Sequence, residues 1–257
     1  MDLGLQGRVA LVTGGTKGIG LACARALAAE GVRVAVASRA PANIAAAVAQ
    51  VPGAIGVAAD FVDADAALNA IDEVERRLGA IDILVNSAGA ARRKGADELA
   101  PADWRAAMDA KFFTYVNAFD PLSKRMAARG RGVIVNVIGM GGKVASPTHL
   151  AGGAANAALM LATTGLANAY AARGLRVVGV NPGLTETERL AEGLAASAKQ
   201  MGVDLAEARR REAAAIPLGR LASPQEIADV VVFLCSDRAG YVTGITIGMD
   251  GARFATP

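Results

Sequence analysis

A cluster of glycines near the start of the chain has the spacing of a phosphate-binding turn. The stretch Thr13-Gly14-Gly15-Thr16-Lys17-Gly18-Ile19-Gly20 follows the apolar run 9–12 and precedes a helix-forming run over 21–29. Glycines let the backbone approach an anion closely, and the unpaired N–H groups and dipole of a first helical turn face that anion. The Gly-x-x-x-Gly-x-Gly spacing therefore predicts the diphosphate-binding corner of a dinucleotide fold, although an ordinary tight turn without a ligand has the same pattern.

The segments around this turn alternate apolar strands with alanine-rich helices. Strands are predicted at 9–12, 32–37, 54–59, 81–85, 132–138, 176–180 and 245–248, and helices at 21–29, 41–51, 63–78, 101–128 (two helices), 150–172 and 224–234. This alternation predicts an α/β fold of the doubly wound Rossmann type, a single domain over 1–257 whose parallel sheet has helices on both faces. The charged segment 184–218 is predicted to be a helical substrate lid over the carboxyl edge of the sheet.

The composition excludes several other classes of protein. With 257 residues, 53% hydrophobic and 20% charged, the chain is expected to be one globular, soluble domain. A net charge of +3 is too small for a nucleic-acid-binding protein. Cys23 and Cys235 fall in separate predicted helices without metal-ligand spacing, which indicates reduced core residues of a cytoplasmic protein and no metal site.

Two further segments bear on location. The stretch that precedes the first strand is too short for a signal peptide. Residues 150–172 carry no charge and are long enough to span a bilayer, but they consist largely of Ala, Gly, Thr and Asn. This modest hydrophobicity favours a buried helix over a membrane span.

Further motifs make the chain resemble the short-chain dehydrogenase/reductases. The glycine turn resembles their Thr-Gly-x-x-x-Gly-x-Gly, and residues 86–89 resemble their Asn-Asn-Ala-Gly with one change. Residues 182–187 resemble their Pro-Gly-x-x-x-Thr. The C-terminal signature of the family is matched by residues 217–220, 224–228, 243–244 and 250–251. The resemblance covers essentially the whole chain. It implies a seven-stranded sheet, a nicotinamide cofactor across the carboxyl ends of the strands, and a homodimer or homotetramer in which the helix over 150–172 packs against its mate.

The resemblance also implies where the cofactor lies. Asp60 and Phe61 are expected at the adenine ring, residues 86–89 at the adenosine ribose, and residues 182–187 at the nicotinamide. The predicted cofactor-binding residues are Gly14, Thr16, Lys17, Gly18, Ile19, Gly20, Ser38, Arg39, Asp60, Phe61, Asn86, Ala88, Gly89, Pro182, Gly183, Leu184, Thr185 and Thr187.

The residues after the second strand favour NADP(H) over NAD(H). An acidic residue at the end of that strand would bind both ribose hydroxyls and repel a 2′-phosphate. Ser38 and Arg39 stand there instead, and a guanidinium suits a phosphate. Lys17 is expected to add a second cation from the glycine turn, although both cations could equally be solvated surface residues.

The catalytic positions implied by the resemblance are all substituted. The family uses a serine, a tyrosine thirteen residues later, a lysine four residues after that, and an asparagine on the preceding helix. Aligning the strand at 134–137 places Gly139 at the serine, Gly152 at the tyrosine and Asn156 at the lysine, and counting from Trp104 places Lys111 at the asparagine. Hydride transfer by the usual mechanism is therefore expected to be impaired, and the two glycines at 152–153 are expected to leave a void.

Two residues are candidates for the missing acid/base. Lys111 brings an ammonium into a site that lacks its usual lysine, unless it faces solvent or caps a carbonyl. His149, the only histidine, lies three residues before Gly152, and imidazole suits proton transfer near neutral pH, unless it is a loop residue without chemistry. Ser146 and Thr148 could donate to a carbonyl. The tyrosines at 115 and 170 are distant from the loop in sequence, and neither precedes a lysine by four.

The sequence therefore favours one function and leaves two others open. The favoured function is an NADP(H)-dependent carbonyl reductase or alcohol dehydrogenase that acts on a small molecule with an atypical active site. One alternative is a catalytically silent scaffold or sensor that binds NADP(H). The other is a non-redox enzyme on this fold, such as a lyase or hydratase.

Overall fold

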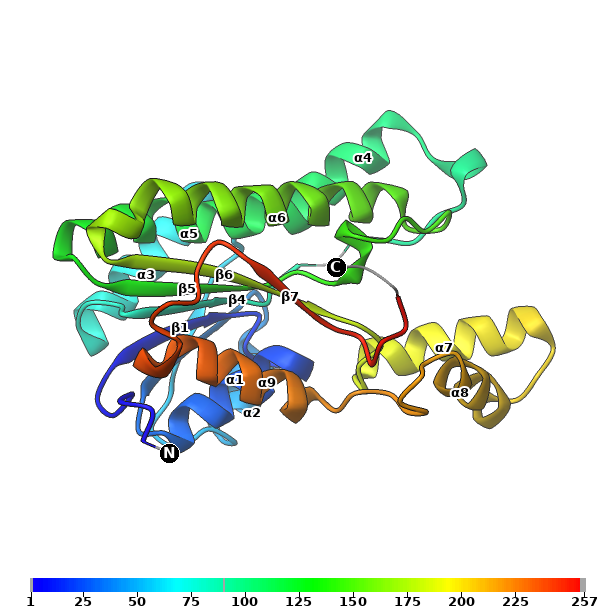
Figure 1. The fold of residues 1–257 in the computed structure, drawn as a ribbon, viewed down its shortest axis with the longest axis horizontal. Coiled ribbons are helices and arrows are strands. Elements are labelled where there is room, and N and C mark those ends of the chain that lie inside the picture. Colours follow the sequence, from blue (N-terminus) through cyan, green and yellow to red (C-terminus); the bar gives the residue numbers. More distant parts are fainter. Residues whose placement is uncertain (1, 90, 255–257) are drawn as a thin grey trace.

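Parallel strands form one sheet in the centre of the molecule (Figure 1). The computed structural model describes residues 2–89 and 91–254, so residues 1, 90 and 255–257 of the predicted domain lie outside the described residues. The strands are β1 (Val9–Thr13), β2 (Arg33–Ser38), β3 (Ile55–Ala58), β4 (Ile83–Asn86), β5 (Gly132–Val137), β6 (Leu175–Pro182) and β7 (Thr246–Met249). Their order is β3-β2-β1-β4-β5-β6-β7, with every neighbouring pair parallel. The predicted doubly wound, seven-stranded α/β fold is confirmed.

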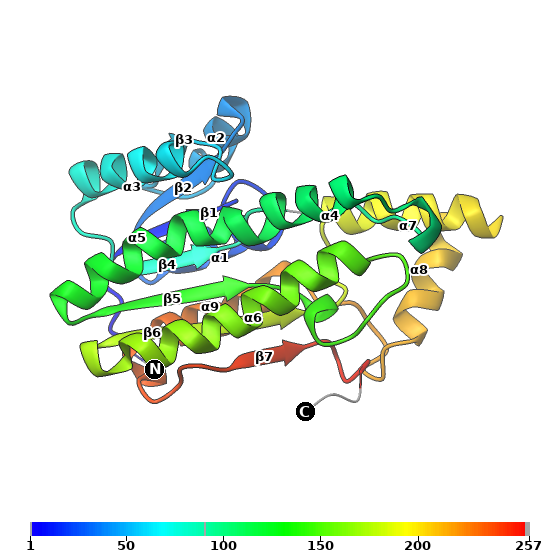
Figure 2. The same ribbon diagram turned by 90° about the horizontal axis from the view of Figure 1, so that it is seen from above.

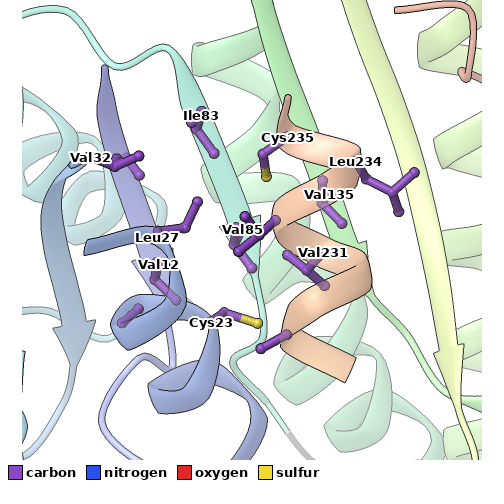
Figure 3. Packing of buried hydrophobic residues seen from close by; sticks show 14 of the residues in the cluster. Val12, Cys23, Leu27, Val32, Ile83, Val85, Val135, Val231, Leu234 and Cys235 are labelled. Carbon is purple, nitrogen blue, oxygen red and sulfur yellow. The ribbon is translucent and has the colours of Figure 1, made fainter. Parts of the chain in front are cut away.

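Helices cover both faces of this sheet, as Figures 1 and 2 show. On one face lie α1 (Gly18–Ala29), α2 (Pro41–Val48) and α9 (Pro224–Cys235), and on the other lie α3 (Ala64–Leu78), α5 (Thr114–Arg129) and α6 (Leu150–Tyr170). Each face has its own buried cluster of aliphatic side chains. Figure 3 shows the cluster between the sheet, α1 and α9, in which Cys23 and Cys235 are both buried and unpaired. Because these thiols are enclosed, they contribute to packing.

Capping explains where several helices begin. The Asp63 carboxylate accepts hydrogen bonds from the backbone N–H groups of residues 65 and 66 at the start of α3. Ser223 and Glu226 form a reciprocal capping box at α9, with Pro224 in the first turn. In contrast, α1 has neither a side-chain cap nor an acidic residue in its first turn. Its N–H groups are therefore left for another partner.

The remaining elements gather at the carboxyl edge of the sheet. The predicted helical pair over 101–128 consists of α4 (Pro101–Ala107) and α5, joined by a π-helical turn over Met108–Phe113. The segment predicted as a lid contains α7 (Glu188–Met201) and α8 (Leu205–Ala214), which extend beyond the strand ends opposite α4 (Figure 1). Short 3₁₀ turns occupy Ala96–Glu98, Met140–Gly142, Ala171–Arg173 and Asp237–Ala239, so the predicted loop over 139–147 is partly helical.

One face of the uncharged helix α6 packs against the sheet. Leu159 and Ala167 belong to the buried cluster over β5 and β6, whereas Leu161 is 76% exposed on the other face. The segment Leu150–Arg173 is long and apolar enough to cross a membrane by length and composition alone, and core helices of soluble proteins pass the same test. Its packing agrees with the predicted core helix.

Candidate active site and cofactor cleft

A single large cavity of about 1400 Å³ runs along the carboxyl edge of the described sheet. It is lined by the segments that follow β1, β2, β3, β4, β5 and β6, together with the π turn and α7. The strand order reverses between β1 and β4, so the connections after these two strands leave in opposite directions. Ligands of doubly wound sheets bind at this switch point.

The glycine turn fits the diphosphate of a dinucleotide cofactor. A Cβ atom on Gly14 would lie 2.8 Å from the backbone of Ala88, and one on Gly20 would lie 2.3 Å from the Gly14 carbonyl oxygen. Gly18 has a φ of +51°, which side-chain-bearing residues rarely adopt. The turn therefore packs backbone against backbone and directs the uncapped first turn of α1 toward the cavity, an arrangement whose free N–H groups suit an anion.

Most of the predicted cofactor-binding residues line this cavity. Those that do are Gly14, Lys17, Gly18, Ile19, Ser38, Arg39, Asp60, Phe61, Ala88, Gly89, Pro182, Gly183, Leu184, Thr185 and Thr187. Three of the predicted residues do not, namely Thr16, Gly20 and Asn86. Gly20 serves the close approach of α1 to the turn.

The Asn86 side chain belongs to a buried row of hydrogen bonds, and its place along the ribose stays a prediction. Its side chain accepts a hydrogen bond from Thr13 Oγ1 (3.2 Å) and donates one to Asn136 Oδ1 (3.0 Å). Asn136 in turn donates to Thr163 Oγ1 (2.9 Å) on α6. All four side chains are buried, so the row of hydrogen bonds joins β1, β4, β5 and α6 beneath the cavity.

The two predicted cations, Arg39 and Lys17, line the cavity where the adenosine is predicted to bind, each beside an acid. Ser38 ends β2, and Arg39 follows it with its guanidinium 3.9 Å from the Asp60 carboxylate and 77% of its side chain exposed. Lys17 Nζ lies 3.2 Å from Glu188 Oε2 on α7. Lys17 therefore contacts the predicted lid, so the two cations do not share a partner in this structure.

Lys111 reaches the cavity from the π turn, at the end where the nicotinamide is predicted to bind. A π turn inserts one extra residue into a helix and is frequent at functional sites. Here it directs a lysine inward, so that Lys111 is only 8% exposed while it lines the cavity. Its Nζ donates hydrogen bonds to Tyr115 Oη (2.8 Å) and to the Val137 carbonyl oxygen (3.1 Å) at the end of β5. An ammonium has three N–H donors, which leaves one for a ligand.

Burial shifts the acidity of this pair in opposite directions. Desolvation, helped by the nearby Arg189 guanidinium, lowers the pKa of Lys111 to about 7. Desolvation also raises the pKa of Tyr115 well above its usual range, so its phenol stays protonated and donates to the Val137 carbonyl oxygen (2.5 Å). The group that exchanges a proton near neutral pH is therefore the amine.

Tyr115 contacts Lys111, although its distance from the 139–147 loop in sequence had argued against a role for it. It follows Lys111 by four residues, one helical turn later, and Lys111 Nζ also lies 4.4 Å from its ring centroid. The family pattern has a lysine four residues after a tyrosine, whereas this helix carries the two in the reverse order. Tyr170, the other dismissed tyrosine, lies at the opposite end of α6 from His149.

His149 lies at the N-terminal end of α6, packed between two glycines. Its imidazole would come within 3.0 Å of a Cβ on Gly141 and 2.1 Å of a Cβ on Gly152. Its Nδ1 is buried without a hydrogen-bond partner among the described residues. Burial, followed by the charges of Arg93, Lys111 and Arg189, lowers the pKa of His149. The ring is therefore neutral at neutral pH, and it does not line the cavity with Lys111.

Other features occupy the positions that the resemblance aligns with the family's catalytic residues. The predicted void at Gly152 is wrong, because the His149 ring fills the direction of its absent side chain. Gly139 has a φ of +115°, so a serine at this position would be strained. Asn156 is buried on α6. Thr148 lines the cavity, and its Oγ1 lies 3.4 Å from Ser146 Oγ.

Comparisons with known proteins agree with this architecture. A family model described as Enoyl-(Acyl carrier protein) reductase matches residues 14–252. D-threitol dehydrogenase of Mycolicibacterium smegmatis is 36% identical over 256 residues, which cover 97% of this chain and 94% of that protein. Acetoacetyl-CoA reductase of Shinella zoogloeoides is 37% identical over 248 residues, which cover 96% of this chain and 98% of that protein.

A solved structure extends the likeness to three dimensions. L-sorbose reductase from Gluconobacter frateurii, complexed with NADPH and L-sorbose, aligns with a TM-score of 0.94 at 30% identity, over 100% of both chains. The chain belongs to the short-chain dehydrogenase/reductase family. These relatives are dehydrogenases and reductases, which supports the expectation that this protein is an oxidoreductase.

Proposed function

We propose that this protein is an NADP(H)-dependent oxidoreductase that interconverts a carbonyl and an alcohol on a small molecule, with Lys111 as its acid/base. The observation that carries the proposal is the placement of the Lys111 ammonium at the nicotinamide end of the cavity, with a pKa of about 7 and one donor left for a ligand. A general acid works best when its pKa lies near the working pH.

The role of Lys111 follows from its contacts. The nicotinamide, when bound, supplies or accepts the hydride at the reacting carbon. During reduction the Lys111 ammonium donates a hydrogen bond and then its proton to the substrate oxygen, leaving a neutral amine that takes a proton from solvent. The Val137 carbonyl and the Tyr115 hydroxyl hold Nζ in place during this exchange. Tyr115 is therefore a positioning residue.

The adenosine end supports NADP(H) as the cofactor. No acid follows β2, and the exposed Arg39 guanidinium stands where a 2′-phosphate would bind. The structural relative complexed with NADPH agrees with this preference. We expect Arg39→Gln to weaken NADPH binding by about tenfold or more, the size of a charge-assisted hydrogen bond, and to change NADH binding little. Fluorescence titration of both nucleotides measures this, and equal dissociation constants in the wild-type protein would contradict the preference.

Three further features belong to the same proposal. Segment 184–218 acts as the substrate lid, because α7 lines the cavity and its Glu188 contacts the glycine turn. The protein assembles as a homodimer or homotetramer, and it works in the cytoplasm, where its two buried cysteines stay reduced.

A carbonyl panel tests the activity. Aldehydes and ketones of varied size are mixed with the protein and NADPH, and the loss of nicotinamide absorbance is followed for the wild type and for Lys111→Met. We expect turnover by the wild type and a loss of about 10²–10⁴-fold in Lys111→Met, with NADPH affinity unchanged. Tight NADPH binding without any turnover would favour the alternative of a catalytically silent scaffold or sensor. The substituted serine and tyrosine positions are the observation in favour of that alternative. Conversion of a substrate without a change in nicotinamide absorbance would favour a non-redox enzyme.

A further inference from the structure

Two arginines of the cavity lining, Arg93 and Arg189, form no ion pair with an acid whose side chain the structure describes. Arg93 lies on the connection after β4, and Arg189 lies in the first turn of α7, so they reach the cavity from opposite sides of its lining. Among the side chains that the structure describes, neither forms a hydrogen bond or an ion pair with the protein. Both line the same cavity as Lys111.

The other surface cations of this cavity are paired. Lys17 contacts Glu188 (3.2 Å), Arg39 contacts Asp60 (3.9 Å) and Lys94 contacts Asp103 (2.7 Å). The lining acids do not compensate the two arginines, because Glu212 is paired with Arg253 (2.9 Å) and the exposed Glu98 has no cation within 4 Å among the described residues. The positive charge of Arg93 and Arg189 is therefore not balanced by any lining acid that the structure describes.

The charge of these arginines affects the pKa values of two neighbouring groups, Lys111 and His149. Arg189 contributes to the lowered pKa of Lys111, and Arg93 and Arg189 both contribute to the lowered pKa of His149. Two guanidiniums and an ammonium that face one cavity repel one another, and an anion between them relieves this repulsion. A guanidinium binds carboxylate or phosphate through two parallel hydrogen bonds.

Building on the proposed carbonyl chemistry, we propose that the substrate carries a carboxylate or phosphate group, which Arg93 and Arg189 bind while its carbonyl oxygen meets Lys111. The cofactor diphosphate has its own partner in the first turn of α1, so these arginines are available to the substrate. The Arg189 position on α7 also lets an anion draw the lid segment toward the connection after β4.

Matched pairs of probes that differ in charge test this proposal. Acetoacetate is compared with its methyl ester, and dihydroxyacetone phosphate with dihydroxyacetone, by kcat/KM with NADPH. The two pairs separate a carboxylate from a phosphate preference. Arg93→Gln and Arg189→Gln are measured beside Arg92→Gln, the matched control, since Arg92 is an exposed neighbour that does not line the cavity.

We expect the anionic member of at least one pair to have a kcat/KM about tenfold or more above its neutral partner, the size of a charge-assisted hydrogen bond. Arg93→Gln and Arg189→Gln should each reduce this ratio about tenfold, and Arg92→Gln should keep it. Equal values within both pairs, or a ratio that survives in both variants, would overturn the proposal. So would an Arg189→Gln variant that loses NADPH affinity and keeps the ratio, because Arg189 would then bind the cofactor.

A binding measurement separates this proposal from the proposed reduction. Calorimetry of the protein–NADP⁺ complex with the same four probes reports the anion preference without turnover. Preference for the anions that is lost in Arg189→Gln, together with no reduction of any probe or panel carbonyl, would support the anion site and contradict the redox activity. Equal binding of charged and neutral probes alongside measurable reduction would contradict the anion site alone.

Discussion

The buried Lys111 ammonium destabilises the fold near neutral pH, where we propose that it acts as an acid. In the unfolded chain its pKa is that of an ordinary lysine, about 10.4, whereas burial lowers it to about 7 in the folded protein. Between these values the unfolded state binds one more proton than the folded state, so this site makes stability rise with pH. Below pH 7 both states are protonated, and the full cost of the buried charge is present.

Replacing Lys111 with methionine should therefore stabilise the protein while it removes the acid. We expect Lys111→Met to raise the free energy of unfolding by roughly 1–3 kcal/mol at pH 6 and by less at pH 9, measured by urea denaturation. Lys124→Met is the control, because Lys124 is exposed on α5 and its pair with Asp120 should change stability little. A Lys111→Met variant that is less stable than the wild type at both pH values would contradict the buried-charge account.

Tyr115 contacts the Lys111 ammonium through a single hydrogen bond. Its Oη accepts from the Lys111 ammonium, and a hydrogen bond to the charged form favours that form. Tyr115→Phe should therefore lower the pKa of Lys111 further below 7. Nuclear magnetic resonance of lysine side chains labelled at Cε, titrated with and without Lys111→Met to assign the signal, measures this shift. An unchanged or raised pKa in Tyr115→Phe would show that the hydroxyl does not stabilise the ammonium.

At the scale of elements, the N-terminal turn of α6 is built around the absence of a side chain at residue 152. The His149 ring occupies the place of that side chain, and Ala91 Cβ would lie 2.8 Å from any Cβ there. Restoring a tyrosine by Gly152→Tyr alone is therefore expected to leave activity unimproved. The local structure has adapted to the substitution, so the lost residue cannot be replaced in isolation.

A double-mutant cycle tests this packing. Gly152→Ala should cost about 1–3 kcal/mol through overpacking, even though alanine favours a helix by about 1 kcal/mol. The cost should shrink in the His149→Ala background. Gly193→Ala, in helix α7 with open space around its Cβ position, should instead be neutral or stabilising. Urea unfolding measures all four variants, and the same effect for Gly152→Ala and Gly193→Ala would contradict the model of a filled position.

The strands, the helices and the cofactor turn were predictable because each depends on local patterns. Alternating apolar runs and helix-capping residues such as Asp63 and Ser223 determine the elements within a few residues. The neighbours of Lys111 and His149 were not predictable in this way. The contact between Lys111 and Tyr115 depends on a π turn that no sequence period reveals, and the place of His149 over Gly152 depends on how residues 139–149 return to α6.

At the scale of the whole molecule, the outer face of α6 is the expected contact between subunits. The exposed residues of α6 are 154, 157, 161, 164, 165, 168 and 169, of which all but Leu161 are Ala, Gly, Thr or Asn, so a second helix can approach closely. Leu161 stands out on this face with 76% of its surface exposed. Leu161→Asp should place a carboxylate in that contact and shift the protein to monomers, as measured by sedimentation velocity. Leu205→Asp on α8 serves as the control, and an unchanged assembly in Leu161→Asp would move the interface elsewhere.

The proposed mechanism requires the Lys111 ammonium to protonate the substrate while the cofactor reduces it. Single-turnover oxidation of bound NADPH by a reactive ketone from the panel, followed across pH for the wild type and Lys111→Met, tests this most directly. We predict a wild-type rate that falls as pH rises through about 7, because the ammonium is lost, and a Lys111→Met rate that is about 10²–10⁴-fold lower without that transition. Equal rates and pH profiles for the two proteins would contradict Lys111 as the acid.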